Sequence, residues 1–250
     1  MTTVLRRVIF IAMLAGIWEV TSRLSDLPTF MFPSFTQVIQ TLLSGLISGQ
    51  MISAITSSLG RLLLGFSIAI ILGLLLGYLI WRFKLVEDTL GFLVTALQSI
   101  PSIVWFPLAI IWFGLNDIAI LFIVTIGATW TMTINATSGF KNVPTLYQRV
   151  GKTFGSNGFH FLRTVILPSS VPQLISGLRI AWAFSWRALM AGELLGAGNG
   201  LGQLLETGRS LGQMDLVISV MIIIGVIGTI MDNVVFLRLE RNVQKKWGVS

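Results

Sequence analysis

The sequence predicts an all-α membrane protein, a polytopic bundle of about six transmembrane helices, and three observations lead to this prediction. Hydrophobic residues make up 54% of the 250 positions and charged residues only 11%, whereas soluble domains carry about 25% charged residues. The apolar residues fall into long runs that approach the roughly 20 residues needed to cross a bilayer. Lys and Arg collect in alternate gaps between these runs. We therefore expect one transmembrane domain over residues 1–250, with its core at about 55–240.

Six apolar runs are the expected spans. The first run is short and follows Arg6 and Arg7, which is also the pattern of a signal peptide, but no A-x-A cleavage site comes after it. We therefore expect an uncleaved first span. The six runs cover residues 8–21, 61–81, 90–113, 118–136, 171–195 and 216–237.

The basic residues indicate how the chain is oriented. Six spans place both termini on one side of the membrane, and twelve of the 17 Lys and Arg residues fall in the loops of that side. Because Lys and Arg are retained in cytoplasmic loops, we expect both termini in the cytoplasm. We attribute the net charge of +7 to this bias and expect no nucleic-acid partner. The twelve residues are Arg6, Arg7, Arg82, Lys84, Lys141, Arg149, Lys152, Arg163, Arg238, Arg241, Lys245 and Lys246.

The third run contains two prolines, Pro101 and Pro107. Proline inside a helix removes a backbone hydrogen bond and kinks the rod, and membranes tolerate this where neighbouring groups or water satisfy the freed backbone. Two interpretations stay open. Either the span is a broken helix that lines a cavity, with Gln98 and Ser99 on the translocation pathway, or the kink serves packing alone.

An amphipathic helix is expected outside the spans. Ser34 and Gln37 fit a capping box that opens a helix, and the apolar residues after them recur at helical spacing. The pattern predicts a helix at about 34–48, which either lies on the outer interface or packs on the bundle.

Two glycine patterns predict local structure. Gly73 and Gly77 form a small-xxx-small pair, which favours close helix packing inside the bundle. The glycine-rich stretch 196–202 lacks the spacing and the βαβ context of a dinucleotide-binding motif, so it predicts a flexible external loop.

Five ionisable residues lie within the predicted spans: Glu19, Arg179, Arg187, Glu193 and Asp232. An ionised side chain at the helix centre costs about 2.5–3.5 kcal/mol on insertion scales, so each of these needs a partner or water. Arg179 and Asp232 lie near the ends of their spans, where long side chains can snorkel. Arg187 and Glu193 lie deeper, and they border the translocation pathway or serve structural pairing.

Nothing in the sequence predicts catalysis. The chain has no Cys and one His, and it shows no carboxylate pair, triad or metal-ligand spacing, so we expect no catalytic residue, metal or cofactor in this chain. Gly151-Lys152-Thr153 resembles the end of a P-loop, but Leu146 occupies the position of the required glycine. We therefore expect that the chain does not bind ATP by itself.

The segment 144–168 is basic and helix-compatible in a chain that is otherwise mostly apolar. It carries the four basic residues Arg149, Lys152, His160 and Arg163, together with apolar residues at near-helical intervals. Gly155 and Gly158 are expected to divide it into two short helices. It is an ordinary cytoplasmic loop or a surface that contacts another protein.

The residues of this segment resemble the EAA loop of bacterial ABC-importer permeases. The resemblance rests on Gly155, nine intervening residues, and then Val165, Leu167 and Pro168. Other stretches resemble the nitrate, sulfonate, taurine and bicarbonate branch of these permeases, and they lie at 98–114, 177–182, 193–202 and 232–241. One departure stands out, because Arg149-Val150-Gly151 occupies the place of the acidic-Ala-Ala triplet.

The resemblance implies a type I ABC importer permease fold in a bacterial inner membrane, with a cytoplasmic coupling helix in the loop at about 144–168. It implies four kinds of partner: a second permease copy, as in a homodimer; two cytoplasmic ATP-binding subunits that use ATP and Mg²⁺; an extracytoplasmic solute-binding protein; and the lipid bilayer. The implied ATPase-coupling residues are Arg149, Val150, Gly151, Phe154, Gly155, Leu167 and Pro168.

The same resemblance implies a small solute, namely nitrate, an alkanesulfonate, taurine or bicarbonate. A thiamine precursor or a riboflavin-type solute is the alternative within the same class of permease. A stand-alone secondary transporter fits less well, because the chain shows no internal repeat.

Overall fold

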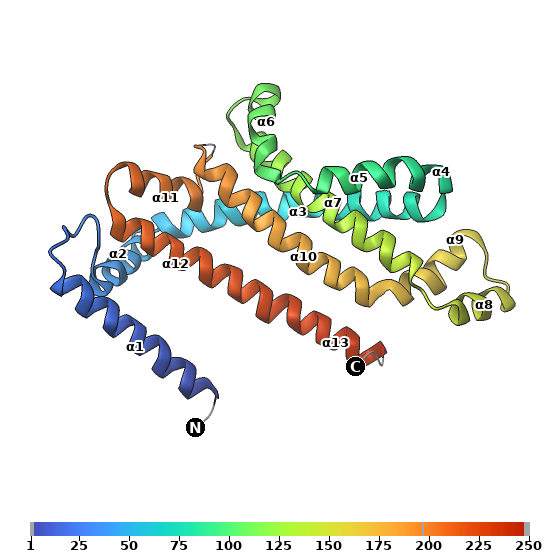
Figure 1. Ribbon diagram of the computed structural model, residues 1–250, viewed down its shortest axis with the longest axis horizontal. Helices are drawn as coiled ribbons and strands as arrows, with labels where there is room; N and C mark the ends of the chain where they lie inside the picture. Colours follow the sequence, from blue (N-terminus) through green and yellow to red (C-terminus); the bar gives the residue numbers. More distant parts are fainter. Residues whose placement is uncertain (1–2, 197, 248–250) are drawn as a thin grey trace. The chain divides into compact units, whose positions relative to one another are not determined.

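The computed structural model describes residues 3–196 and 198–247, and these residues form helices joined by turns, with no β-strand among them (Figure 1). The all-α prediction is confirmed. The contacts within the chain divide it into two units, which are described separately below. Unit 1 comprises Met1–Ser58 and Glu193–Val226, and unit 2 comprises Leu59–Gly192 and Ile227–Ser250.

The helical elements follow one another closely along the chain. The α-helices are α1 (Thr3–Leu24), α2 (Phe35–Ile47), α3 (Gln50–Arg82), α4 (Lys84–Val86), α5 (Phe92–Gln98), α6 (Phe106–Phe113), α7 (Asp117–Lys141), α8 (Thr145–Thr153), α9 (Gly158–Phe161), α10 (Leu167–Leu194), α11 (Leu201–Ser210), α12 (Met214–Ile230) and α13 (Leu237–Trp247). Three π-helical segments, η1 (Glu87–Gly91), η3 (Leu162–Ile166) and η4 (Met231–Phe236), and one 3₁₀ segment, η2 (Ser102–Trp105), lie between them.

Four of the six expected spans are supported by helix length and composition. Within the described residues, three continuous helices are long and apolar enough to cross a membrane, Gln50–Arg82, Asp117–Lys141 and Met214–Lys245. The pair Lys84–Gln98 and Ser102–Phe113, whose axes differ by 98°, is a fourth, broken span or a re-entrant loop. The other two expected spans are helical, in α1 and α10, but charged and polar side chains interrupt their apolar runs.

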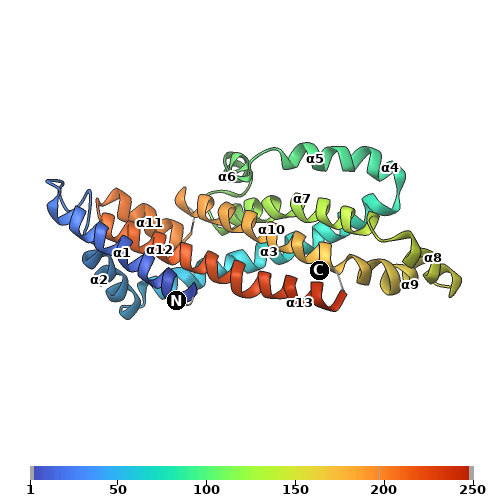
Figure 2. The ribbon, with the colours of Figure 1, turned by 60° about the horizontal axis from the view of Figure 1, so that its bottom comes forward.

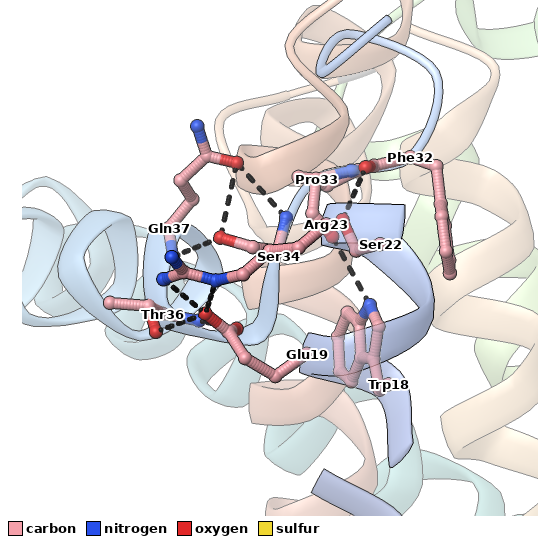
Figure 3. Close-up of polar contacts among 9 residues, drawn as sticks. All are labelled: Trp18, Glu19, Ser22, Arg23, Phe32, Pro33, Ser34, Thr36 and Gln37. Carbon is pink, nitrogen blue, oxygen red and sulfur yellow. Dashed lines mark hydrogen bonds and ion pairs between the residues drawn. The ribbon is translucent and has the colours of Figure 1, made fainter. Parts of the chain in front are cut away.

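In unit 1, side chains of α1 form hydrogen bonds with the turn that leads into α2 (Figure 3). The Trp18 indole donates to the Pro33 carbonyl at 3.1 Å, and the Ser22 hydroxyl donates to the Phe32 carbonyl at 2.9 Å. The Glu19 carboxylate accepts from the backbone N–H of Thr36 at 3.0 Å. Because a helix N-terminus carries unpaired N–H groups, an acid at this position stabilises the first turn of α2.

The predicted capping box at the start of α2 is confirmed. Ser34 Oγ accepts from the Gln37 N–H, and the Gln37 side chain accepts in return from the Ser34 N–H at 2.9 Å. The helix then runs to Ile47 as predicted, and it is tied to α12 by the Ser219 hydroxyl, which donates to the Val38 carbonyl at 2.8 Å.

In unit 2, the glycine pair of α3 packs directly on α7. A Cβ atom added at Gly73 would lie 2.6 Å from Cβ of Met132, and one added at Gly77 would lie 2.6 Å from Cβ of Ala136. These approaches are possible only without a side chain, so the prediction of internal close packing is confirmed.

The third predicted span is broken where its prolines predict (Figure 2). α5 ends at Gln98, and after Pro101 the chain makes the 3₁₀ turn η2 and turns sharply into α6. Pro107 lies in the first turn of α6, where a missing N–H removes no intrahelical hydrogen bond.

The prediction of an external loop over 196–202 is wrong in its second half. Residue 197 lies outside the described residues, but Leu201 and Gly202 form the first turn of α11. The physical reason is a buried carboxylate that binds this turn, as described in the next section.

Candidate coupling surface and intramembrane polar clusters

The segment between α7 and α10 folds into the two short helices expected from its glycines. Three residues separate the end of α7 from the start of α8, and α9 continues through η3 into α10 (Figure 1). Gly155 has a φ of +76° and Gly158 a φ of +55°, a backbone region that suits glycine, so the chain reverses between α8 and α9 at these two positions.

This segment exposes large apolar side chains although it lies outside the apolar spans. Phe154 is 85% exposed and Phe159 is 74% exposed, and Leu146, Tyr147 and Val150 on α8 are also exposed. Scattered apolar residues are normal on a protein surface, but five on one short segment form a patch of the kind that marks a protein interface. We call these five residues the loop patch.

Two exposed cations, Arg149 and Lys152, lie on α8, the helix that also carries Leu146, Tyr147 and Val150 of the loop patch. Neither side chain makes an ion pair or hydrogen bond with any residue that the structure describes. α8 therefore carries exposed cations as well as exposed apolar side chains, and both are available to a partner protein.

The structure explains why glycine, Gly151, occupies the third position of the replaced triplet. A Cβ atom at Gly151 would lie 2.6 Å from Val165 Cγ2 and 3.2 Å from the Phe161 ring. Gly151 therefore lets α8 rest directly on α9 and η3, a contact that no local sequence signal revealed.

Leu167 and Pro168 begin α10 immediately after the π-helical segment η3. Pro168 has no N–H to donate to the preceding turn, and a π turn with its i→i+5 bonds is one way for a helix to continue past such a position. The helical path consequently runs without a gap from Gly158 to Leu194, so the loop is continuous with a long helix.

Gln98 and Ser99 lie exposed at the break of the third span. The Ser99 hydroxyl donates to the Ala96 carbonyl at 2.6 Å, whereas Gln98 makes no side-chain hydrogen bond with a described residue. The indole nitrogens of Trp105 and Trp130 are buried, and neither has an acceptor among the described residues. Buried donors normally have partners, so an acceptor is expected at the indole of Trp105, which lies in η2 at this break.

Arg179 of α10 is bound by two acids from the C-terminal part of the chain. Its Nε and Nη2 donate to the two carboxylate oxygens of Asp232 at 2.6 and 2.8 Å, and its Nη1 donates to Glu240 at 3.1 Å. Ser176 donates to the same Glu240 carboxylate at 2.8 Å. The expectation that Arg179 and Asp232 simply snorkel is therefore wrong, because the two side chains form a bidentate pair.

Arg187 differs from Arg179 in having no acid partner. It lies exposed two turns further along α10, and it makes no hydrogen bond or ion pair with any described residue. Its guanidinium carbon lies 6.0 Å from the centroid of the Phe184 ring. An open pocket of about 340 Å³ extends between the two arginines and is lined by Ser176, Arg179, Ile180, Ala183, Phe184, Arg187, Asp232 and Glu240.

Glu193 is the most deeply buried charged residue described, with 0% of its surface exposed. In unit 1 its carboxylate accepts from the Ser58 hydroxyl at 2.8 and 2.9 Å and from the Gly202 N–H at 2.9 Å. Ser58 Oγ in turn accepts from the Leu201 N–H at 2.9 Å. A Cβ atom at Gly200 would lie 2.2 Å from Glu193 Oε1, so the carboxylate fits against a glycine at the start of α11.

The sequence-predicted site residues therefore fall into separate groups. The coupling residues lie together in unit 2 around α8, α9 and the start of α10, and Arg187 lines the pocket on α10. Glu193 instead lies inside a hydrogen-bonded cluster of unit 1. Sequence reasoning missed Ser58 and Glu240, which are 135 and 61 residues from their partners. Among the described residues, no group of His, Cys, Asp and Glu could hold a metal ion.

Comparison with known proteins gives one consistent family. Residues 69–248 match the family described as binding-protein-dependent transport system inner membrane component. A Methanocaldococcus jannaschii protein named as an ABC transporter permease is 36% identical over 230 residues, which cover 88% of this chain and 84% of the relative. An aliphatic sulfonates transport permease of Bacillus subtilis is 27% identical over 94% of this chain and 85% of its own length. The nitrate import permease of Synechocystis sp. is 31% identical over 71% of this chain and 65% of its own length.

The solved structures agree on the fold. A chain of the MetNI methionine ABC transporter in an inward-facing conformation superposes with a TM-score of 0.69 at 19% identity, covering 78% of this chain and 96% of that chain. The match over residues 69–248 and the relative that is 36% identical over 88% of this chain identify one family. The chain belongs to the inner-membrane components of binding-protein-dependent transport systems, the non-catalytic permease subunits of ABC importers.

Proposed function

We propose that this permease moves a small solute with one anionic group, an oxyanion or a sulfonate, into the cell. In this proposal two copies of the chain form the pathway, two cytoplasmic subunits bind ATP with Mg²⁺ and drive it, and an extracytoplasmic binding protein delivers the solute. The relatives named for sulfonates, nitrate, bicarbonate and taurine support the choice of solute. Arg187 on α10, which has no acid partner among the described residues, supports it independently.

The observation that carries the proposal is the loop patch on a segment with exposed cations. Clustered apolar side chains outside the membrane-spanning helices mark an interaction site, and no described residue covers Phe154, which is 85% exposed. A partner that moves on binding ATP would push on this patch. Because α9, η3 and α10 are continuous, the push would reach the helix that carries both arginines.

The orientation follows from the same proposal. If the loop patch binds a cytoplasmic ATPase, α7 ends and α10 begins at the cytoplasmic face. Both termini then lie in the cytoplasm, and α2 and α11 lie towards the outside. The bias of Lys and Arg towards the loops of the terminal side supports this arrangement.

Reconstitution tests the proposal. The permease, its ATP-binding subunit and its binding protein are placed in proteoliposomes, and uptake of labelled nitrate, taurine and ethanesulfonate is measured with and without ATP. We expect ATP-dependent uptake of at least one of these anions. Uptake of none of them, or uptake by the permease alone, would contradict the proposal.

One substitution tests the loop patch directly. Phe154→Ser removes the most exposed apolar side chain of the patch, so we expect ATPase binding and ATP-driven uptake to fall at least about tenfold, because a buried aromatic anchor contributes about 2 kcal/mol or more to an interface. The matched control is Phe30→Ser, the same change at an exposed phenylalanine between α1 and α2. Equal uptake in both variants would show that the loop patch is not part of the ATPase interface.

A further inference from the structure

The two arginines of the α10 pocket are not equivalent, and the difference identifies a candidate binding group. Arg179 uses three of its nitrogens on Asp232 and Glu240, so its donors are largely occupied. Arg187 has only the Phe184 ring near its guanidinium among the described residues. A guanidinium presents five donors in a planar fork that fits oxyanions and carboxylates.

Arg187 lies well inside the predicted span 171–195. It lies about 6 Å from the middle of that span, and the nearer end of the helix is the C-terminal one. Helical side chains lean towards the N-terminus, and the contact with Phe184, three residues earlier, shows this lean. The side chain therefore leans away from the nearer end of the predicted span, which disfavours snorkelling to that end.

The pocket is also polarised along its length. The Arg179, Asp232 and Glu240 cluster carries a net charge of −1, about 12 Å along the helix from Arg187. A second anionic group on the solute would be repelled at that end. The pocket therefore favours a solute with a single anionic group and a neutral or cationic remainder.

We infer that Arg187 binds the anionic group of the solute as it passes along α10, and that Arg179 shapes the same pocket without binding the solute. This inference rests on the proposed function and names the residue that selects for anions within it. Nitrate and short sulfonates are the class of ligand that the pocket would take.

The absence of native cysteine allows a direct test on the permease alone. Ala183→Cys places one thiol in the pocket, and a neutral, water-soluble methanethiosulfonate measures its accessibility in proteoliposomes. We expect the thiol to react, and we expect millimolar ethanesulfonate or nitrate to slow the reaction at least about threefold relative to sodium chloride of equal ionic strength. In the double variant Ala183→Cys with Arg187→Gln this protection should disappear, whereas Arg187→Lys should keep part of it.

Each other outcome would overturn the inference. An unreactive thiol would mean that the face lies against lipid or protein. A reactive thiol without protection would mean a hydrated pocket with no anion site, or a guanidinium already held by a lipid phosphate. Protection that survives Arg187→Gln would place the anion site elsewhere. Failure of the wild-type complex to take up any anion is a separate result, which would refute the proposed function whatever the thiol experiment shows.

Discussion

At the scale of single residues, the chain uses two buried or half-buried acids to order the starts of helices. Glu19 accepts from the first turn of α2, and Glu193 accepts from the first turn of α11. An anion at a helix N-terminus interacts favourably with the helix dipole and satisfies N–H groups that lack intrahelical partners. Each acid thus stabilises the first turn of a short helix.

Loss of the Glu193 carboxylate should destabilise the protein. Glu193→Ala leaves the Ser58 hydroxyl and the Gly202 N–H buried without their acceptor, and each such group costs about 1–3 kcal/mol. We expect a clearly lower midpoint of thermal unfolding in detergent, with a smaller decrease for Glu193→Gln, which keeps one acceptor oxygen.

The matched control for this change is Glu206→Ala on α11. Glu206 is partly exposed and pairs with the exposed Arg209, whose hydrogen bonds lower the pKa of the Glu206 carboxyl. A surface pair of this kind contributes little to stability, so the control should unfold near the wild-type temperature. An equal decrease in both variants would contradict the role given to Glu193.

At the scale of elements, the reversal between α8 and α9 depends on backbone geometry more than on contacts. No atom lies within 4 Å of a Cβ placed on Gly155, so a side chain would have room there. The constraint at this position is the backbone, because a φ of +76° disfavours residues other than glycine. A branched side chain in this backbone region is strained by roughly 1–2 kcal/mol.

Gly155→Val should therefore lower ATP-driven uptake without lowering the amount of protein in the membrane. The strain is expected to turn α8 relative to α9, so the loop patch would meet its partner in the wrong geometry. We expect normal amounts of protein in the membrane and at least a fivefold loss of ATP-driven uptake. Gly225→Val, at a helical glycine with equally open surroundings in α12, serves as the control and should retain uptake. Full uptake in Gly155→Val would show that the reversal tolerates other conformations.

At the scale of the whole molecule, the predicted sidedness is open to a direct measurement. Single cysteines at Phe154 and at Phe30, placed in the cysteine-free chain, report opposite sides of the membrane if the proposed topology is right. An impermeant thiol reagent added to intact cells should label Phe30→Cys and leave Phe154→Cys unlabelled until the cells are opened. The reverse pattern would put the loop patch outside the cell and remove its proposed role.

Features with a local signal could be predicted from the sequence, and features that join distant residues could not. The capping box at Ser34, the break at Pro101 and the reversal at Gly155 each depend on residues a few positions apart. The Glu193 cluster and the Arg179 pair join residues 53 to 143 positions apart. The sequence showed that buried charges need partners, but the folded chain was needed to show that Arg179 has them and that Arg187 does not.

The packing of α7 on α10 has a mechanical consequence for the loop between them. A Cβ atom at Gly177 would lie 2.6 Å from Cβ of Asn135, and the Ser170 hydroxyl donates to the Gly139 carbonyl at 3.0 Å. Because both ends of the loop are anchored on helices in such close contact, we expect any displacement of α8 to move α7 and α10 together and not to separate them.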